Sequence, residues 1–392
     1  MVEYIASQDG HLLNIEAKYY NKLDIEAFSQ MMKDPSYCYK FYWLEAVVHI
    51  ISEGKNETTF DEIIDEMIAN AWYSVREFHI HLSGIQADGL VRDGLERAIL
   101  QLTELSDLPA NASKIEIKNA IREHQAGLKK AKEQLTNMVP YRALAGFFTG
   151  SNEVPDWGSV KRITAYIQKI NELVTPLPYV LGESSKLKKE VHFHPDWVAM
   201  IQDNTVNILG WIQYEKVKWL QNNNPEVPGL IYKLAPMDEK MRKLSNVRKL
   251  WQGIMKVQEI RDVFTGQPVK EKQYDVDHFI PWSFVMNDEL WNLMPMDSSL
   301  NSAKSNRLPK WNPFFEVFAE NQYLMYEMIN ERPELHKRFE ACYRDNLHSI
   351  WAGQELYRKG NSREVFYNIL ERNMMPVYDS ARRQGYEIWN YG

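Results

Sequence analysis

The chain contains little cysteine and no long apolar run. Only two cysteines, Cys38 and Cys342, occur among 392 residues, which argues against a disulfide-stapled scaffold and fits a reducing cytoplasm. The most apolar stretch, residues 41–51, is short and interrupted by a glutamate and a histidine, whereas a membrane-spanning helix needs roughly 20 apolar residues. The N-terminal residues begin neither a signal peptide nor an Arg-rich transit peptide. We therefore expect a cytoplasmic protein that does not engage a membrane.

The rest of the composition is ordinary for a globular protein. Hydrophobic residues make up 44% and charged residues 25% of the chain, so its length suffices for two or three domains with real cores. The net charge is −7, but between Lys240 and Lys310 twelve Lys and Arg residues face eight Asp and Glu residues. A locally basic site on an acidic body can hold a phosphate backbone, while the acidic remainder argues against wide, non-specific coating of DNA.

Helical patterns dominate both ends of the chain. Apolar residues recur with helical spacing through most of residues 1–235 and again after Pro313. The predicted helices cover residues 61–75, 114–135, 205–220, 236–257, 314–330, 333–346 and 362–372. No internal repeat or low-complexity tract interrupts this pattern. The sequence therefore predicts a mainly helical protein.

The most informative stretch lies between the two helical regions. Asp277 and His278 end an apolar, strand-like run, Asn292 follows after a short loop, and Asn301 lies one turn before Lys304 on a helix-like segment. Histidine can take a proton from water near neutral pH. Oxygen ligands can hold a hard cation, which stabilises charge on a phosphate and its leaving group. This order of residues is what metal-assisted phosphodiester cleavage requires.

This segment, from about Trp251 to Pro309, resembles the HNH endonucleases, also called the ββα-metal or His-Me finger group. It is most similar to the zinc-free branch that includes the HNH domain of the RNA-guided CRISPR nucleases. The resemblance implies that His278 is the general base and that Asp277 and Asn301 are metal ligands. It also implies bound Mg²⁺ or Mn²⁺, and products with 5′-phosphate and 3′-hydroxyl ends.

The resemblance assigns two further residues to the catalytic set. Asn292 corresponds to the asparagine that braces the loop of the family's site, and we expect its amide to satisfy backbone groups of that loop. Lys304 corresponds to a basic residue one helical turn after the second ligand. We expect Lys304 to contact phosphate, although a purely solvated lysine is the alternative.

The chain departs from many relatives at their zinc-binding positions. Those relatives carry two Cys-x-x-Cys pairs, whereas Asp262, Thr265, Asp297 and Leu300 stand at the four positions here. We therefore expect no structural zinc, and the ββα unit must be held by packing. The expected packing residues are Phe264, Phe279, Trp282, Phe284, Trp291, Leu293, Leu300 and Leu308.

Local patterns predict the elements of this unit. We expect strands over residues 275–280 and 291–296 and a helix over residues 298–306, with Asp297 or Ser298 as its N-cap. The fold class is then mainly α with a small α+β insert. The expected organisation is a helical domain over 1–235 that binds a partner or regulates, an HNH nuclease domain over 236–312, and a helical C-terminal segment over 313–392. That segment is expected to pack on the rest of the chain, chiefly on the N-terminal helices.

Two His-x-His pairs raise the alternative of a second metal site. His79 and His81 form one pair, and His192 and His194 form the other. Neither has a nearby cysteine or a clear third ligand, and a metal site needs both ligand number and geometry. We therefore favour ordinary histidines at all four positions.

These observations predict a metal-dependent HNH endonuclease that cleaves DNA, in bacterial defence against phage or foreign DNA. A protein partner or a second copy of the chain would bind through the helical domain. An acidic helical body beside a cationic nuclease segment predicts low activity in the isolated protein, with stimulation by a partner, a ligand or oligomerisation. The alternative is that the acidity serves only solubility. An RNA-directed nuclease and a nucleic-acid-binding or assembly module with a structural HNH unit also remain open, because kinship over a short segment does not fix a target.

Overall fold

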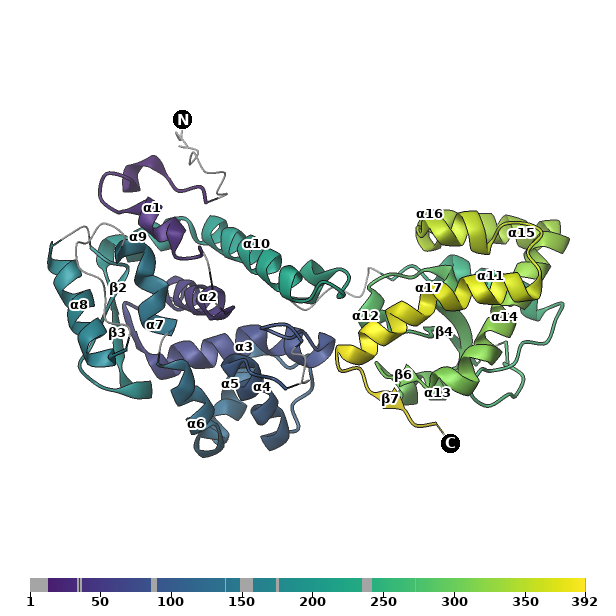
Figure 1. Cartoon of the computed structure of the whole chain (residues 1–392), viewed down its shortest axis with the longest axis horizontal. Coiled ribbons are helices and arrows are strands. Elements are labelled where there is room, and N and C mark those ends of the chain that lie inside the picture. The colour runs from purple at the N-terminus through teal and green to yellow at the C-terminus, as the bar shows by residue number, and fades with distance from the viewer. Residues whose placement is uncertain are drawn as a thin grey trace. The chain divides into compact units, whose positions relative to one another are not determined.

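The computed structural model describes residues 13–391, except residues 34, 36, 86–89, 138, 149–157, 174–175, 235–241 and 272. The chain divides into two compact units (Figure 1). Unit 1 contains residues 1–225 and 233–235, and unit 2 contains residues 226–232 and 236–392. Helices dominate and the sheets are small, which confirms the predicted fold class. Among the described residues, no helix has both the length and the apolar character needed to cross a bilayer.

Unit 1 is organised around two long helices, α2 (Tyr39–Ser52) and α3 (Phe60–Phe78), which pack against each other. Their buried faces carry large aromatic residues, including Trp43 and Trp72, which are fully buried. Further helices and 3-10 turns of unit 1 are η1 (Ala17–Tyr19), α1 (Ile25–Gln30), α4 (Gly94–Leu105), α5 (Lys114–Glu123), α6 (Gln125–Leu135), α7 (Val139–Arg142), η2 (Ala143–Phe148), α8 (Val160–Leu173), η3 (Lys186–Lys188), α9 (Pro195–Asp203) and α10 (Thr205–Asn223). The turn η4 (Leu230–Lys233) follows in the chain, and its residues 230–232 belong to unit 2.

A small antiparallel sheet in unit 1 was not predicted. Its strand order is β1 (Glu57–Thr59), β3 (Glu190–Phe193) and β2 (Tyr179–Leu181). The strands are three or four residues long, too short to show a clear alternation of apolar and polar residues in the sequence. Burial of Val191 and Tyr179 places one face of this sheet against the helices.

The predicted single helix over residues 114–135 is wrong, because the chain turns at His124 between α5 and α6. Each half packs separately, α5 against α3 and α6 against α4. The approach of α6 to α4 depends on Gly127, where an added Cβ would lie only 2.7 Å from Leu105 Cδ1. Packing of the two halves mainly on different helices therefore outweighs the continuous helical pattern.

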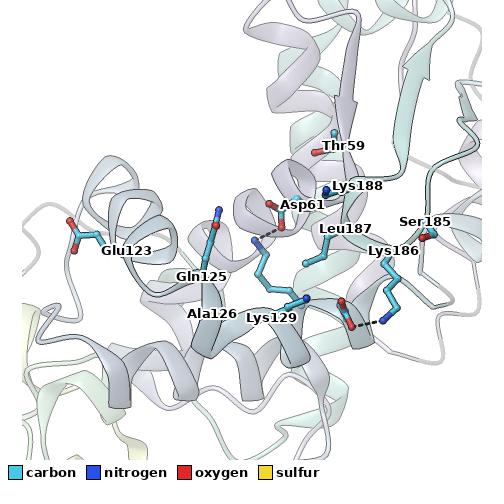
Figure 2. A pocket seen from close by; sticks show the side chains of 12 residues that line it. Thr59, Asp61, Glu123, Gln125, Ala126, Lys129, Ser185, Lys186, Leu187 and Lys188 are labelled. Atoms are coloured by element: carbon cyan, nitrogen blue, oxygen red, sulfur yellow. Dashed lines mark hydrogen bonds and ion pairs between the residues drawn. The ribbon is translucent and has the colours of Figure 1, made fainter.

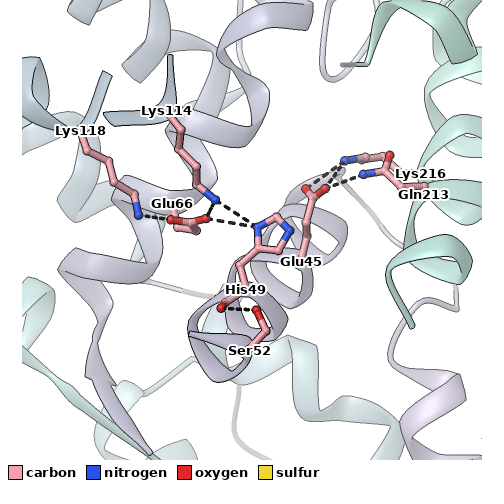
Figure 3. A network of polar contacts seen from close by, with 8 residues as sticks. All are labelled: Glu45, His49, Ser52, Glu66, Lys114, Lys118, Gln213 and Lys216. Carbon is pink, nitrogen blue, oxygen red and sulfur yellow. Dashed lines mark hydrogen bonds and ion pairs between the residues drawn. The ribbon is translucent and has the colours of Figure 1, made fainter. Parts of the chain in front are cut away.

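Buried ion pairs connect the helices of unit 1 (Figure 3). Lys216 Nζ of α10 lies 2.9 Å from Glu45 Oε2 of α2, and both side chains are buried. Gln213 Nε2 donates a second hydrogen bond to Glu45 at 2.5 Å. A neighbouring carboxylate, Glu66 of α3, is paired with Lys114 and Lys118 of α5. Because each buried carboxylate has cationic partners, the helices are held in a specific register.

The Glu45–Lys216 pair yields a stability prediction. Lys216→Ala leaves a buried carboxylate without its cation, so the free energy of unfolding should fall by about 3–5 kcal/mol. Lys218→Ala is the matched control, since Lys218 makes an exposed pair with Glu215 and should change stability by less than about 1 kcal/mol. Urea unfolding of the full chain measures both. Equal losses in the two variants would contradict the account.

Unit 2 contains the predicted ββα unit. Strands β4 (Tyr274–His278) and β5 (Leu293–Asp297) pair antiparallel, with His278 opposite Leu293. Helix α13 (Ser298–Lys304) follows directly, and the Asp297 side chain caps it by accepting hydrogen bonds from Ser299 N and Leu300 N. The two strands, the helix and the Asp297 cap are confirmed, with bounds shifted by about two residues.

The C-terminal helices complete the core of unit 2. The Phe279 ring, just after β4, lies 4.7 Å from that of Phe318, and the Phe264 ring lies 4.9 Å from those of Phe314 and Trp389. These C-terminal side chains share one hydrophobic core with the ββα unit. The expectation that the C-terminal segment packs chiefly on the N-terminal helices is therefore wrong.

The other elements of unit 2 are α11 (Ser245–Met255), α12 (Trp282–Val285), η6 (Leu290–Asn292), β6 (Leu308–Pro309), α14 (Trp311–Glu331), α15 (Pro333–Glu340), α16 (Tyr343–Asn346), η7 (Ala352–Leu356), α17 (Arg363–Arg383) and β7 (Ile388–Trp389).

Several predicted helix bounds differ from the observed ones. The helix predicted over residues 236–257 is α11, which begins at Ser245, and the part over 236–241 lies outside the described residues. The helix predicted over 333–346 divides into α15 and α16, and α17 continues past Pro376 to Arg383. Most of the expected packing residues are buried, but Leu300 and Trp282 are only partly buried.

Candidate active site

The predicted metal ligands lie between β4 and α13. Successive side chains of a strand point to opposite faces, so Asp275 and Asp277 share one face of β4, and α13 contacts this strand. Asn301 Nδ2 of α13 donates a hydrogen bond to Asp275 Oδ2 at 3.3 Å. Asn301 and Lys304 are spaced i, i+3 and both contact β4. These two residues therefore mark the face of α13 that lies against β4.

Lys304 is buried, which differs from the expected contact with phosphate. Its Nζ lies 2.9 Å from Asp277 Oδ2 and donates to the backbone oxygen of His278 at 2.8 Å. The side chain has no exposed surface. Lys304 thus balances the charge of Asp277 and holds the end of β4.

His278 is held at both ring nitrogens. Its Nε2 lies 3.1 Å from the backbone oxygen of Asn287 and 3.1 Å from Asp288 Oδ1. Both partners only accept hydrogen bonds, so the proton of the neutral ring belongs on Nε2. The lone pair is then on Nδ1, which lies 3.2 Å from Arg242 Nη2, a donor. The ring is therefore oriented as a general base that would act through Nδ1.

Asp288 anchors this arrangement. Burial raises the pKa of its carboxyl group, but the imidazole of His278 beside it, the N–H of Lys243 and the charge of Arg242 outweigh burial, so the pKa is lowered overall. Its Oδ2 accepts from Lys243 N at 2.6 Å. The ionised carboxylate thus fixes both the imidazole and the backbone of residues 242–243.

Asn292 braces the loop that joins the two strands. It is fully buried. Its Oδ1 accepts from Ile280 N, and its Nδ2 donates to Ile280 O, both at 2.8 Å. This closed pair of hydrogen bonds matches the expected bracing and positions the loop that carries Asn287 and Asp288.

At the positions that bind zinc in relatives, a carboxylate makes the cross-link. Asp262 Oδ1 accepts from Phe264 N and Thr265 N, both at 3.0 Å. Its Oδ2 accepts from Asp297 N at 3.0 Å. Asp262 is buried, so one side chain ties the turn at 262–266 to the start of α13.

The oxygen donors near β4 fit a hard cation. Asp275, Asp277 and Asn301 offer two carboxylates and one amide oxygen, the ligand types that Mg²⁺ prefers. A site made only of His, Cys, Asp and Glu is not found: among the described residues, no three such side chains are placed to hold a metal ion. The two His-x-His pairs likewise form no such site among the described residues, and His81 is paired with Glu96.

Three residues of the site were missed in the sequence. Asp275 could have been found, because it stands two residues before Asp277 in a predicted strand and so shares its face. Asp288 lies in a loop whose conformation the sequence does not specify. Arg242 is 36 residues away from His278 in the chain, and no local pattern connects them.

A surface pocket of about 810 Å³ lies in unit 1 between α6 and η3, away from the residues described above in the sequence (Figure 2). Its lining is rich in lysine, but Lys132 is paired with Asp61 at 2.6 Å and Lys186 with Glu133 at 2.8 Å. These pairs balance the charge of the two lysines. It holds none of the residues expected to take part in phosphodiester chemistry.

Comparison with known proteins agrees with this geometry. The family model of the HNH endonucleases matches residues 262–310. Residues 262–310 form an HNH domain. The match spans the Asp262 turn, both strands and α13, and confirms the resemblance inferred from the sequence. The chain thus carries a nuclease domain, whose family acts on nucleic acid and generally uses divalent metal ions. No curated protein and no solved structure matches this chain.

The Asn292 brace of the HNH domain gives a prediction. Asn292→Ala leaves the buried N–H and C=O of Ile280 without partners, so the free energy of unfolding should fall by about 2–4 kcal/mol. Asn287→Ala is the matched control, because Asn287 is exposed and contacts His278 only through its backbone; its effect should be within about 0.5 kcal/mol. Urea unfolding measures both, and an Asn292→Ala variant as stable as the control would contradict the bracing role.

Proposed function

We propose that this chain is a metal-dependent endonuclease that hydrolyses phosphodiester bonds of DNA. The observation that carries the proposal is the oriented His278 ring, with its Nδ1 lone pair presented beside β4 and its Nε2 fixed by Asn287 O and Asp288. An HNH fold kept only for assembly would not require a buried carboxylate to fix the tautomer of this one histidine.

In the proposed mechanism, His278 Nδ1 takes a proton from the attacking water. The Asp288 carboxylate stabilises the imidazolium that forms, because its Oδ1 lies only 3.1 Å from Nε2. Asp275, Asp277 and Asn301 would hold Mg²⁺ or Mn²⁺. When bound, that cation supplies charge stabilisation at the phosphate and the leaving 3′-oxygen. Lys304 keeps Asp277 in position, and Asn292 keeps the loop of Asp288 in position.

The choice of DNA and of a defence role rests on broader features. The segment from Lys240 to Lys310 is cationic within an acidic chain, which suits local contact with a duplex rather than wide coating. Unit 1 is a large separate helical unit, which would bind a protein partner or a second copy. We place the protein in the cytoplasm, in defence against phage or foreign DNA. RNA as the substrate is the alternative that the same assay resolves.

The test is cleavage by the full chain. With Mg²⁺, the protein should cut plasmid DNA, and His278→Ala should cut about 10²–10⁴-fold more slowly under single-turnover conditions, because the general base is lost. His192→Ala is the matched control, since His192 is a half-exposed histidine of unit 1, and it should retain the parental rate. Linear DNA and RNA run in parallel decide the substrate.

EDTA supplies the second arm of the same test. It should stop cleavage without lowering the Tm, because Asp262 rather than a metal ties the turn to α13. A His278→Ala variant that cuts at the parental rate would remove the catalytic assignment. Loss of folding in EDTA would show that a structural metal is present instead.

A further inference from the structure

Arg242 contacts the ring nitrogen that carries the catalytic lone pair. Its Nη2 lies 3.2 Å from His278 Nδ1, and its Nε lies 3.9 Å from Asp288 Oδ1. The guanidinium carbon lies 5.6 Å from the centre of the half-buried Trp282 ring. We infer that Arg242 is a further catalytic residue, whose guanidinium contacts the scissile phosphate; this inference rests on the nuclease function proposed above.

The backbone beside Arg242 is fixed by buried side chains. Asp288 Oδ2 accepts from Lys243 N at 2.6 Å, and Asn346 Nδ2 of α16 donates to Lys243 O at 3.0 Å. Asn346 also donates to the backbone oxygen of Asp288 at 2.8 Å. Both Asp288 and Asn346 are buried. Arg242 is therefore held beside His278 by the same groups that hold the imidazole, as a preorganised site requires.

The guanidinium group is partly exposed and can donate hydrogen bonds to a ligand. Its side chain is 40% exposed, whereas the His278 ring beside it is buried. Arginine has five N–H donors in a planar fork and does not lose its proton near neutral pH. Arg242 thus cannot serve as the base, and its contribution must be electrostatic.

The chemistry of the step places phosphate oxygens within reach of this fork. Water that gives its proton to Nδ1 attacks the phosphorus atom, and the bond from phosphorus to the 3′-oxygen breaks. The leaving oxygen takes a proton from solvent water. Through this step negative charge accumulates on the two non-bridging oxygens, next to the attacking water. A guanidinium 3.2 Å from Nδ1 can donate to one or both of them and stabilise that charge.

A blocking role for Arg242 predicts the opposite behaviour. If the guanidinium excluded the attacking water, its removal would accelerate cleavage. The anchoring argues against this role, because Asp288 fixes both residue 243 and His278. Displacing the segment would therefore disturb the base itself.

The test compares variants of the full chain in single-turnover cleavage of plasmid DNA with Mg²⁺. Arg242→Ala should reduce the rate constant by about 10²-fold or more, and Arg242→Lys should recover part of it, since lysine keeps the charge but not the fork. Added guanidinium chloride at millimolar concentration should accelerate Arg242→Ala and leave the parent unchanged. Lys256→Ala is the matched control, because it removes an exposed cation at the end of α11, and it should keep the parental rate.

Each outcome decides the inference. An Arg242→Ala variant that cleaves as fast as the parent, or faster, overturns it while leaving the proposed nuclease intact. A parent that cleaves no nucleic acid overturns both. The Tm of each variant is measured, and Arg242→Gln, which keeps much of the packing on Trp282, replaces Arg242→Ala if the latter is unfolded. Loss of rate without rescue by guanidinium in a folded variant also overturns the contact with phosphate.

Discussion

The Asp288 carboxylate is the interaction on which the HNH site depends. Its Oδ1 lies 3.1 Å from Nε2 of His278, and its Oδ2 accepts a hydrogen bond from Lys243 N. The backbone oxygen of Asp288 is in turn held by Asn346 from α16. Three segments that are distant in the chain therefore meet at one buried charge. Removing one partner of a buried charge is strongly destabilising. The Asp288 carboxylate therefore determines both which ring nitrogen of His278 carries the proton and where Arg242 lies.

The HNH domain relies on the rest of unit 2 for its stability. Where relatives use zinc, Asp262 makes hydrogen bonds to backbone N–H groups on both sides of the site. These bonds replace only the local cross-link. The apolar core comes from the C-terminal helices, through contacts such as that of Phe279 with Phe318. A fragment limited to residues 262–310 would leave that core exposed to water, so the matched segment is part of a larger folding unit.

The sequence predicted the parts of the site that depend on local periodicity. The apolar run that forms β4, the Asp297 cap and the i, i+3 spacing of Asn301 and Lys304 are local features, and the structure contains all three. The role of Lys304 differed, because burial depends on neighbours that a helical pattern does not identify. Asp288 and Arg242 were missed for the same reason. The break at His124 and the sheet of unit 1 likewise follow from packing between elements, which overrides local propensity.

The central claim is that Asp288 and Asn287 O set His278 to carry its proton on Nε2 and to present an unprotonated Nδ1. The most direct measurement is ¹⁵N NMR of the full chain labelled at histidine, at a pH where the ring is neutral. The signals of His278 are assigned by their loss in His278→Ala. The account predicts a protonated Nε2 and a bare Nδ1. A ring protonated on Nδ1 would contradict it, since the hydrogen bond from Nε2 to Asn287 O would then be absent in solution.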